Sequence, residues 1–332
     1  MHSGQSLGDD AIESLLNRLK AFRQFLTLLL AAGVLLGLFR LKVPMFLSPA
    51  NLMDLAQQVS INAILAFGMT LVILIGGIDL SVGALLALTG TVAAYCMVGA
   101  DSGLGLGVMP AVLIGLATAA AAGFCNGVCA SRTAMPAFII TLATMQIERG
   151  AALRFNEGRP LAIPEQYELF LKLGNYRIGD VLPVPVLVML GLFVLAATLL
   201  HRTRFGQHVY AIGGNREAAR FTGIPITRVE TLVYVVCSVF AGVAGLINTA
   251  QLYSAEPASG VGFELNAIAA AVVGGTSFTG GRGTMYGTLL GAVIIGILDK
   301  GLNQAGVHFS FQYIIKGAVI LGAVYLDVRR RK

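Results

Sequence analysis

GGIDLSVGALLALTG, from Gly76 to Gly90, lies inside an apolar stretch of 40 residues that runs from Val59 to Val98. One helix of that length would measure about 60 Å, roughly twice the thickness of the hydrocarbon core of a bilayer. The stretch therefore has to break once. The adjacent glycines Gly76 and Gly77 predict the place, because glycine frees the backbone, and we expect a second helix to begin near Ser81.

The composition indicates that the whole chain is a membrane protein. Of its 332 residues, 56% are hydrophobic and 12% are charged, whereas soluble domains are about half apolar and a quarter charged. The net charge is +6. We expect the Lys and Arg residues to lie at helix ends that face the cytoplasm, and we predict no nucleic-acid partner. The cysteines lie within apolar runs, so we predict packing roles and no metal site for Cys96, Cys125, Cys129 and Cys237.

Apolar runs recur along the chain and predict an all-α bundle of about ten transmembrane helices, including broken or re-entrant ones. The runs cover about 25–39, 57–75, 82–98, 108–130, 136–155, 184–200, 230–250, 264–279, 284–298 and 312–327. The sequence leaves the number of crossings open between eight and ten. With ten, both termini share a side, and most Lys and Arg residues, including those at 329–332, make that side cytoplasmic.

Three regions follow from this topology. Residues 1–24 have amphipathic spacing and predict a cytoplasmic surface segment, with no signal peptide. Residues 25–328 form the transmembrane domain, which carries a cytoplasmic loop at 201–229. Residues 329–332 form a basic cytoplasmic tail.

The cytoplasmic loop contains RTRFGQHVYAIGGNREAARFTGIPITR, from Arg202 to Arg228. Asn215 can cap a helix, Glu217 suits its first turn, and Gly223 can end it. The result is a helix of about two turns, which is too short to be stable alone in water. We expect it to dock in a groove of a partner protein. The alternative is a solvated loop whose arginines set the topology.

The stretch GFELNAIAAAVVGGTSFTGGRGT, from Gly262 to Thr284, predicts further broken helix. Irregular backbone at membrane depth is tolerated where protein buries it or where it lines a cavity. The chain has no Gly-Lys pair, which excludes a P-loop, so we predict that this polypeptide does not hydrolyse ATP through that motif.

A pattern recurs 204 residues apart. Asn62-Ala63-Ile64, followed by Gly76-Gly77 and Gly83, matches Asn266-Ala267-Ile268, followed by Gly280-Gly281 and Gly287. Internal repeats are common in transporters. Glycine-rich helices can also produce such a match by chance, and the sequence leaves both readings open.

Between about Pro44 and Val328, the chain resembles the carbohydrate permeases of binding-protein-dependent ABC importers, of the ribose, xylose and autoinducer-2 type. The resemblance is carried by GMTLVILIGGIDLSVG at Gly68–Gly83, GQHVYAIGGNREAARFTGI at Gly206–Ile224 and AIAAAVVGGTSFTGGRGT at Ala267–Thr284. It implies a sugar-transport subunit of the bacterial inner membrane that is not itself an enzyme.

The resemblance also implies the partners. These are a separate cytoplasmic ATPase, a periplasmic sugar-binding protein and a second permease copy, identical or related. ATP and Mg would be used by the ATPase, so no cofactor is predicted for this chain. The candidate coupling residues are Asn215, Arg216, Glu217, Ala218, Ala219, Arg220 and Gly223.

Polar residues within apolar runs are candidates for the solute path or its gates. Asp79 would cost about 2.5–3.5 kcal/mol if it faced lipid at the bilayer centre, so we expect it either to cap the helix after the break or to line the path. The path candidates are Asn62, Asp79, Ser81, Glu264, Asn266 and Thr276. The chain has no tryptophan, the side chain best suited to stacking on sugar rings, which suggests a conduit of low affinity.

Two other functions remain open at this stage. A branched-chain amino acid permease would share the architecture, and an ion-coupled secondary transporter is the alternative from another class. The second is disfavoured because few ionisable residues lie within the runs. We interpret the neighbours Glu148 and Arg149, and likewise Asp299 and Lys300, as pairs at the ends of runs. The individual sugar is not determined.

Overall fold

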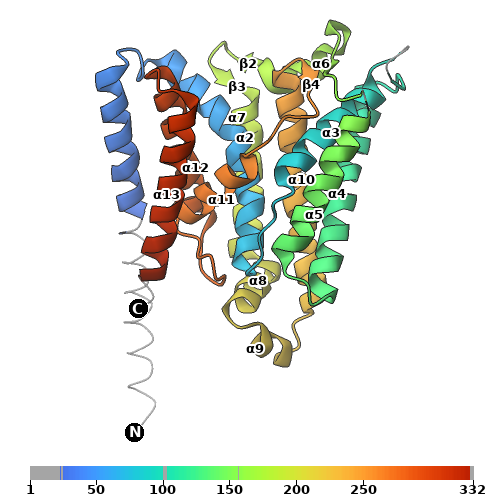
Figure 1. Cartoon of the computed structure of the whole chain (residues 1–332), viewed down its shortest axis with the longest axis vertical. Coiled ribbons are helices and arrows are strands. Elements are labelled where there is room, and N and C mark those ends of the chain that lie inside the picture. The colour runs from blue at the N-terminus through green and yellow to red at the C-terminus, as the bar shows by residue number, and fades with distance from the viewer. Residues whose placement is uncertain (1–22, 24, 100–102, 156, 330–332) are drawn as a thin grey trace.

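The computed structural model describes residues 23, 25–99, 103–155 and 157–329. The predicted N-terminal segment 1–24 lies, apart from Arg23, outside these residues, as does the basic tail beyond Arg329. Long helices run side by side between two ends of the molecule (Figure 1). The predicted all-α fold is confirmed.

Each of the ten predicted runs is a helix in the structure. These helices are Phe25–Lys42, α2 Pro49–Leu74, α3 Val82–Met97, α4 Val108–Arg132, α5 Ala137–Arg154, α7 Val184–Arg202, α10 Ile226–Gln251, α11 Phe263–Val273, α12 Met285–Gln304 and α13 Phe309–Arg329. Within the described residues, six are long and apolar enough to cross a membrane, namely Phe25–Lys42, α2, α4, α7, α10 and α12. The shorter apolar helices include α3 and α11, which adjoin the chain breaks.

Local sequence explains where α2 begins and ends. Ser48 caps it by accepting a hydrogen bond from the Asn51 backbone N–H at 3.3 Å, and Pro49 occupies the first turn, as predicted. After Leu74 the chain passes through Gly76 at φ +80°, a left-handed conformation that favours glycine. The predicted break is therefore confirmed, and α3 follows from Val82.

The second copy of the recurring pattern has the same order of elements. Helix α11 is followed by a break in which Gly275, Gly280 and Gly281 have positive φ angles. Thr284 then caps α12 by accepting from the Gly287 N–H at 3.1 Å. Both copies are thus a helix, a glycine break and a second helix.

The core lies around α2 and α10. Helix α2 is buried from Ala63 to Leu74, and α10 packs against α2, α3 and α4. Small residues allow close approach, since a Cβ added at Gly68 of α2 would lie 2.9 Å from the Cys237 Cα of α10.

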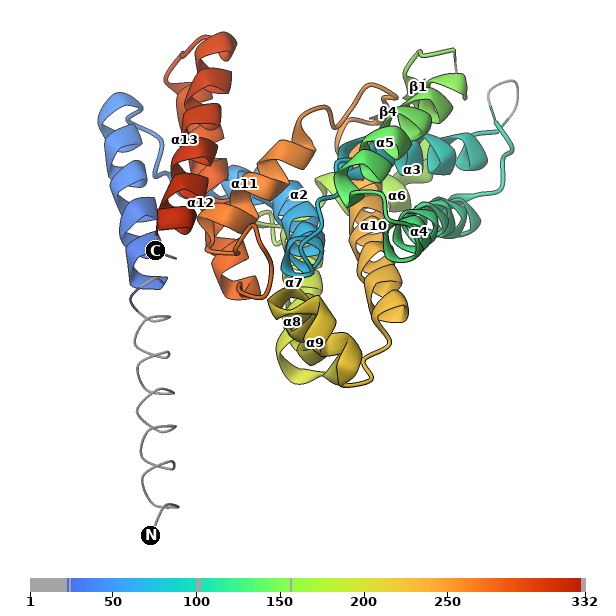
Figure 2. The same ribbon diagram turned by 60° about the horizontal axis from the view of Figure 1, so that its bottom comes forward.

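The two ends of the molecule carry different short elements. At one end lie the strand pairs β1 Leu161–Ala162 with β4 Ser254–Ala255 and β2 Arg177–Ile178 with β3 Leu182–Pro183, together with the 3-10 turn Glu165–Tyr167 and α6 Glu168–Asn175. At the other end lie α8 Arg204–Gly214 and α9 Arg216–Phe221. The start of Phe25–Lys42 and the end of α13 lie toward the α9 end (Figures 1 and 2). We call this the α9 end and the other the α6 end.

Candidate functional site

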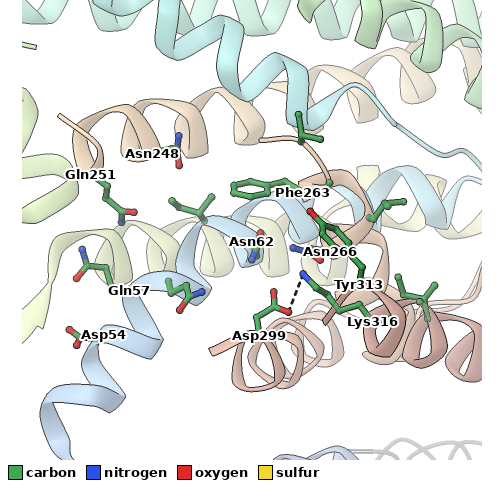
Figure 3. Close-up of a pocket in the computed structure, with 17 residues that line it drawn as sticks. Asp54, Gln57, Asn62, Asn248, Gln251, Phe263, Asn266, Asp299, Tyr313 and Lys316 are labelled. Carbon is green, nitrogen blue, oxygen red and sulfur yellow. Dashed lines mark ion pairs between the residues drawn. The ribbon is translucent and has the colours of Figure 1, made fainter. Parts of the chain in front are cut away.

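A cavity of about 640 Å³ opens between five helices (Figure 3). It lies toward the α6 end, because Asp54 of its lining pairs with Arg177 of β2. The lining comes from the first halves of α2 and α13, the start of α11, and the last turns of α10 and α12. The lining residues are Asp54, Gln57, Gln58, Ile61, Asn62, Asn248, Gln251, Val261, Gly262, Phe263, Leu265, Asn266, Asp299, Tyr313, Lys316, Gly317 and Ile320.

Carboxamide side chains dominate the polar part of the lining. Some are held by neighbours: Gln57 Nε2 donates to the Gly174 carbonyl at 3.0 Å, and Asn248 Nδ2 donates to Ser259 Oγ at 2.8 Å. Two atoms are buried and have no hydrogen-bond partner among the described residues, namely Asn62 Oδ1 on α2 and Gln251 Nε2 on α10. Both atoms are enclosed by the packing of this chain and do not reach the surface of the cavity.

The charged residues of the lining are in ion pairs. Lys316 Nζ of α13 lies 3.2 Å from Asp299 Oδ1 of α12, as Figure 3 shows. Asp54 pairs with Arg177 of β2 at 2.5 Å. The expected pairing of Asp299 with adjacent Lys300 is wrong, because Asp299 pairs with Lys316 and Lys300 Nζ donates to the Asn51 carbonyl at 3.0 Å.

The other neighbours, Glu148 and Arg149, make no direct salt bridge within the described residues. The Arg149 guanidinium donates to the carbonyls of Pro257 at 2.5 Å and Ser259 at 2.7 Å, in the segment between β4 and α11. Both Glu148 carboxylate oxygens are buried and make no hydrogen bond within the described residues. Arg149 thus fastens α5 to the loop that leads into α11.

The structure brings some of the predicted path residues together. Asn62 and Asn266, which are equivalent in the recurring pattern, line the same cavity from α2 and α11. Glu264 precedes Asn266 by two positions but does not line this cavity. Its Oε1 accepts from the Gly262 N–H at 3.2 Å, and its Oε2 lies close to Gly83 at the start of α3.

Asp79 and Ser81 are not part of the cavity lining. Both are fully buried, and Asp79 Oδ1 accepts from the Ser81 N–H at 2.9 Å and from Ser81 Oγ at 2.7 Å. Asn126 Nδ2 of α4 donates to the same hydroxyl at 3.2 Å. This hydrogen-bond network attaches the break between α2 and α3 to helix α4.

Thr276 belongs to the second break, between α11 and α12. Its side chain is buried, and a Cβ added at Gly283 would lie 2.6 Å from Thr276 Oγ1. It therefore lies in a different part of the fold from the cavity.

The two breaks meet each other and the end of α8. The Gly281 N–H donates to the Leu74 carbonyl at 2.9 Å, which links the second break to the last residue of α2. A Cβ at Gly213 would lie 1.7 Å from that same oxygen, and one at Gly280 would lie 3.1 Å from the Gly76 nitrogen. We call this meeting point the glycine joint and define it by Leu74, Gly76, Gly213, Gly280 and Gly281.

Helix α9 begins three positions after Gly213 of the joint. Asn215 caps it, as predicted, with Oδ1 accepting from the Ala218 N–H at 2.9 Å, and Gly223 ends it with φ +81°. Arg216 Nη2 donates to Glu230 Oε2 of α10 at 2.9 Å, which ties α9 to the body of the chain. Ala219 is 4% exposed and is covered by this chain.

The outward surface of α9 is partly apolar. Glu217, Ala218 and Arg220 are exposed, and Phe221 is 90% exposed. A second cavity of about 780 Å³ lies beside this surface, and its lining includes Arg216, Glu217, Arg220 and the residues 224–228.

The sequence analysis did not predict several residues of the first cavity and of the α9 surface. Gln251, Phe263 and Lys316 line the first cavity, and Phe221 forms the apolar tip of α9. Gln251 could have been predicted. Asn248 and Gln251 are three residues apart at the end of an apolar run, so they share a helix face. For Phe221 and Lys316 no sequence pattern indicates which helix face they occupy.

Comparison with known proteins identifies the family. The chain belongs to the family described as "Branched-chain amino acid transport system / permease component", whose model matches residues 51–324. No solved structure matches.

Within that family, the chain is similar to permease proteins of sugar transport systems. The chain is 44% identical over 307 residues to the Ribose import permease protein RbsC of Escherichia coli (strain K12), covering 91% of this chain and 93% of the relative. It is 44% identical over 305 residues to the protein of the same name from Bacillus subtilis (strain 168), covering 90% and 92%. It is 37% identical over 285 residues to the D-allose transport system permease protein AlsC of E. coli (strain K12), covering 85% and 84%.

Proposed function

We propose that this chain is the membrane-spanning permease subunit of an ATP-binding-cassette importer that moves a monosaccharide into the cytoplasm. The observation that carries the proposal is the 44% identity, over about nine-tenths of both chains, to two ribose import permeases from different bacteria. The allose relative, which matches over most of its length, supports a sugar as the solute class.

A separate cytoplasmic ATPase is the energy source in this proposal. Its docking surface would be the exposed side of α9, where Glu217, Arg220 and Phe221 project from a helix that Asn215 caps. An apolar side chain that is almost fully exposed beside charged residues suits a protein interface. Buried Ala219 would contribute packing within this chain.

Movement of α9 has a direct route to the cavity. Helix α8 connects α9 to the glycine joint, and the joint includes the last residue of α2 and the break after α11. Those same two helices carry Asn62 and Asn266 in the cavity lining. ATP-driven closure would therefore reposition the cavity walls, alternating between an outward and an inward opening.

The remaining partners follow from the topology proposed here. A periplasmic sugar-binding protein would deliver the solute at the α6 end, because the cavity lies closer to that end than to the α9 end. A second permease subunit would complete the membrane unit, and the bacterial inner membrane is the expected location. ATP and Mg would be bound by the ATPase, so this chain would need no cofactor.

Reconstitution tests the proposal. The permease, its ATPase and the binding protein are placed in proteoliposomes, and uptake of labelled ribose and labelled leucine is measured with and without ATP. We expect ATP-dependent uptake of the sugar. Transport of leucine alone, or sugar transport that needs no ATPase, would contradict the assignment and would favour, respectively, an amino acid permease or a secondary transporter.

A further inference from the structure

We propose that Arg149 of α5 is a positioning residue for transport, because it fixes the base of a pivot on which α11 turns. The base is the segment 256–260, which follows β4 and which we call the strap. The inference rests on the proposed function. It adds to that function the place where α11 pivots and the side chain that keeps this place still.

The contact between Arg149 and the strap is suited to holding a loop in one place. Nη1 of the guanidinium donates to the carbonyls of Pro257 at 2.5 Å and Ser259 at 2.7 Å. Arg149 forms no ion pair within the described residues, so its charge is directed to these two carbonyls. Hydrogen bonds from a charged donor are stronger than neutral ones, and the planar guanidinium presents its donors in a fixed geometry.

Two further helices hold the strap. From α10, Asn248 Nδ2 donates to Ser259 Oγ at 2.8 Å. On α3, Gly83 lies so close to the strap that an added Cβ would clash with the Gly260 carbonyl oxygen. Helix α3 packs against both α5 and α10. The strap is therefore attached to a unit of three packed helices, and Arg149 supplies its only charged attachment among the described residues.

The chain is free to turn directly after the strap. Gly260 and Gly262 have φ angles of +76° and +84°, a left-handed conformation that glycine adopts without steric cost. Val261 between them is 70% exposed and lines the cavity. Phe263 then begins α11. Hinges are commonly a few residues at the end of an element that absorb a change of backbone angles, so we place the pivot at these two glycines.

The other end of α11 is connected to α9. The break after α11 belongs to the glycine joint, where the Gly281 N–H donates to the Leu74 carbonyl at 2.9 Å, and α8 joins this meeting point to α9. Helix α11 is thus an 11-residue helix between two glycine breaks, and it carries Leu265 and Asn266 of the cavity lining. A displacement at the joint turns α11 only if its other end stays in place. Without Arg149, the same displacement would be absorbed by movement of the strap.

The amount of sugar carried per ATP hydrolysed tests this role. Ribose uptake and ATP hydrolysis stimulated by the binding protein are measured together in proteoliposomes. We expect Arg149→Gln to lower the ratio of uptake to hydrolysis by about 10-fold, because two charge-assisted hydrogen bonds are lost. Arg149→Lys should recover part of the ratio, because an ammonium group still donates to a carbonyl. A variant that merely folds poorly would lower uptake and hydrolysis in proportion and leave the ratio unchanged.

Arg154→Gln is the matched control. Arg154 lies on the same helix and is exposed, so its replacement should leave the ratio of uptake to hydrolysis as in the wild type. A ratio in Arg149→Gln equal to that in Arg154→Gln would overturn the proposal.

A second fastening of the strap tests whether Arg149 acts through it. Asn248→Cys and Ser259→Cys are combined and joined by a short bifunctional thiol reagent, which reaches them because Asn248 lines the cavity. We expect the crosslink to leave uptake intact when Arg149 is present and to restore it in Arg149→Gln, and a reductant to remove the restoration.

Two outcomes of the crosslinking would overturn the proposal. Loss of uptake on crosslinking the protein that retains Arg149 would show that the strap itself has to move. Failure of the crosslink to restore Arg149→Gln would show that this arginine acts elsewhere than on the strap.

A measurement that needs no solute separates this inference from the proposed function. A spin label at Ala258, an exposed residue of the strap, should be more mobile in Arg149→Gln than in the protein that retains Arg149. If the wild-type complex carries ribose while Arg149→Gln changes neither label mobility nor the ratio of uptake to hydrolysis, the importer assignment stands and the pivot is refuted. If the wild-type complex carries no sugar, the proposed function fails, and the role of Arg149 in transport fails with it.

Discussion

Gly213 is the residue at which α8 meets the ends of two broken helices. Its Cα approaches the Leu74 carbonyl so closely that an added Cβ would lie 1.7 Å from the oxygen, and 2.5 Å from the Gly281 nitrogen. Those two atoms are hydrogen-bonded to each other. Both neighbours are backbone atoms, which cannot turn aside as a side chain can.

We expect Gly213→Ala to destabilise the protein by about 1–3 kcal/mol, the usual range for overpacking, because the joint has to open to admit the methyl group. Thermal unfolding in detergent measures the change. Gly214→Ala is the matched control, since a Cβ there meets no described heavy atom within 4 Å, and its melting temperature should equal or exceed that of the wild type. Equal melting temperatures for both variants would contradict the close approach.

At the scale of the element, α9 combines a fixed inner side with an open outer side. Arg216 and Ala219 attach it to the body of the chain. Glu217, Arg220 and Phe221 face outward. A six-residue helix has little stability of its own, so these attachments are what make it a rigid projection.

Reversing the charges on the outer side tests the docking of the ATPase. We expect Glu217→Lys with Arg220→Glu to abolish ATP-dependent uptake and co-purification of the ATPase, because the interface would meet like charges, while the amount of permease in the membrane is unchanged. Co-purification and quantitative blotting of membranes are the measurements.

The control for that variant is a charge reversal at the opposite end. Glu168 and Lys172 form an exposed ion pair on α6 at 2.9 Å, and Glu168→Lys with Lys172→Glu should leave ATPase co-purification intact. Retained transport by the α9 variant would remove the coupling role from α9.

At the scale of the whole molecule, the α6 end and the α9 end define two sides of a membrane. The described ends of Phe25–Lys42 and α13 lie toward the α9 end (Figure 1), which agrees with an even number of crossings. The basic residues of the loop at 201–229 lie at this end, so we expect it, by the positive-inside rule, to be cytoplasmic.

Site-directed labelling tests this orientation. Cysteines are introduced at Leu169, which is 70% exposed on α6, and at Phe221 on α9, after replacing Cys125 and Cys129, whereas Cys96 and Cys237 are buried. We expect a membrane-impermeant maleimide to label position 169 in intact spheroplasts and position 221 in inside-out vesicles. Labelling of both positions from one side would contradict the topology.

The sequence by itself determined the ten helices, the breaks after Ile75 and Val273, and the caps at Ser48 and Asn215. These features depend on local terms: the length of an apolar run, the freedom of glycine and the hydrogen bond from a capping side chain to a nearby backbone N–H. Each acts within a few residues and can be recognised without knowing the rest of the fold.

The tertiary structure alone decided which polar residues share a cavity and which charges pair. Asn62 and Gln251 are 189 positions apart in the numbering. Asp299 forms its ion pair with Lys316 on another helix and not with the adjacent Lys300. Helices in membranes are apolar on most faces, so periodicity does not reveal which face meets which helix. Packing of whole helices settles those contacts, because close approach at small residues such as Gly213 and Gly68 fixes how each helix is turned.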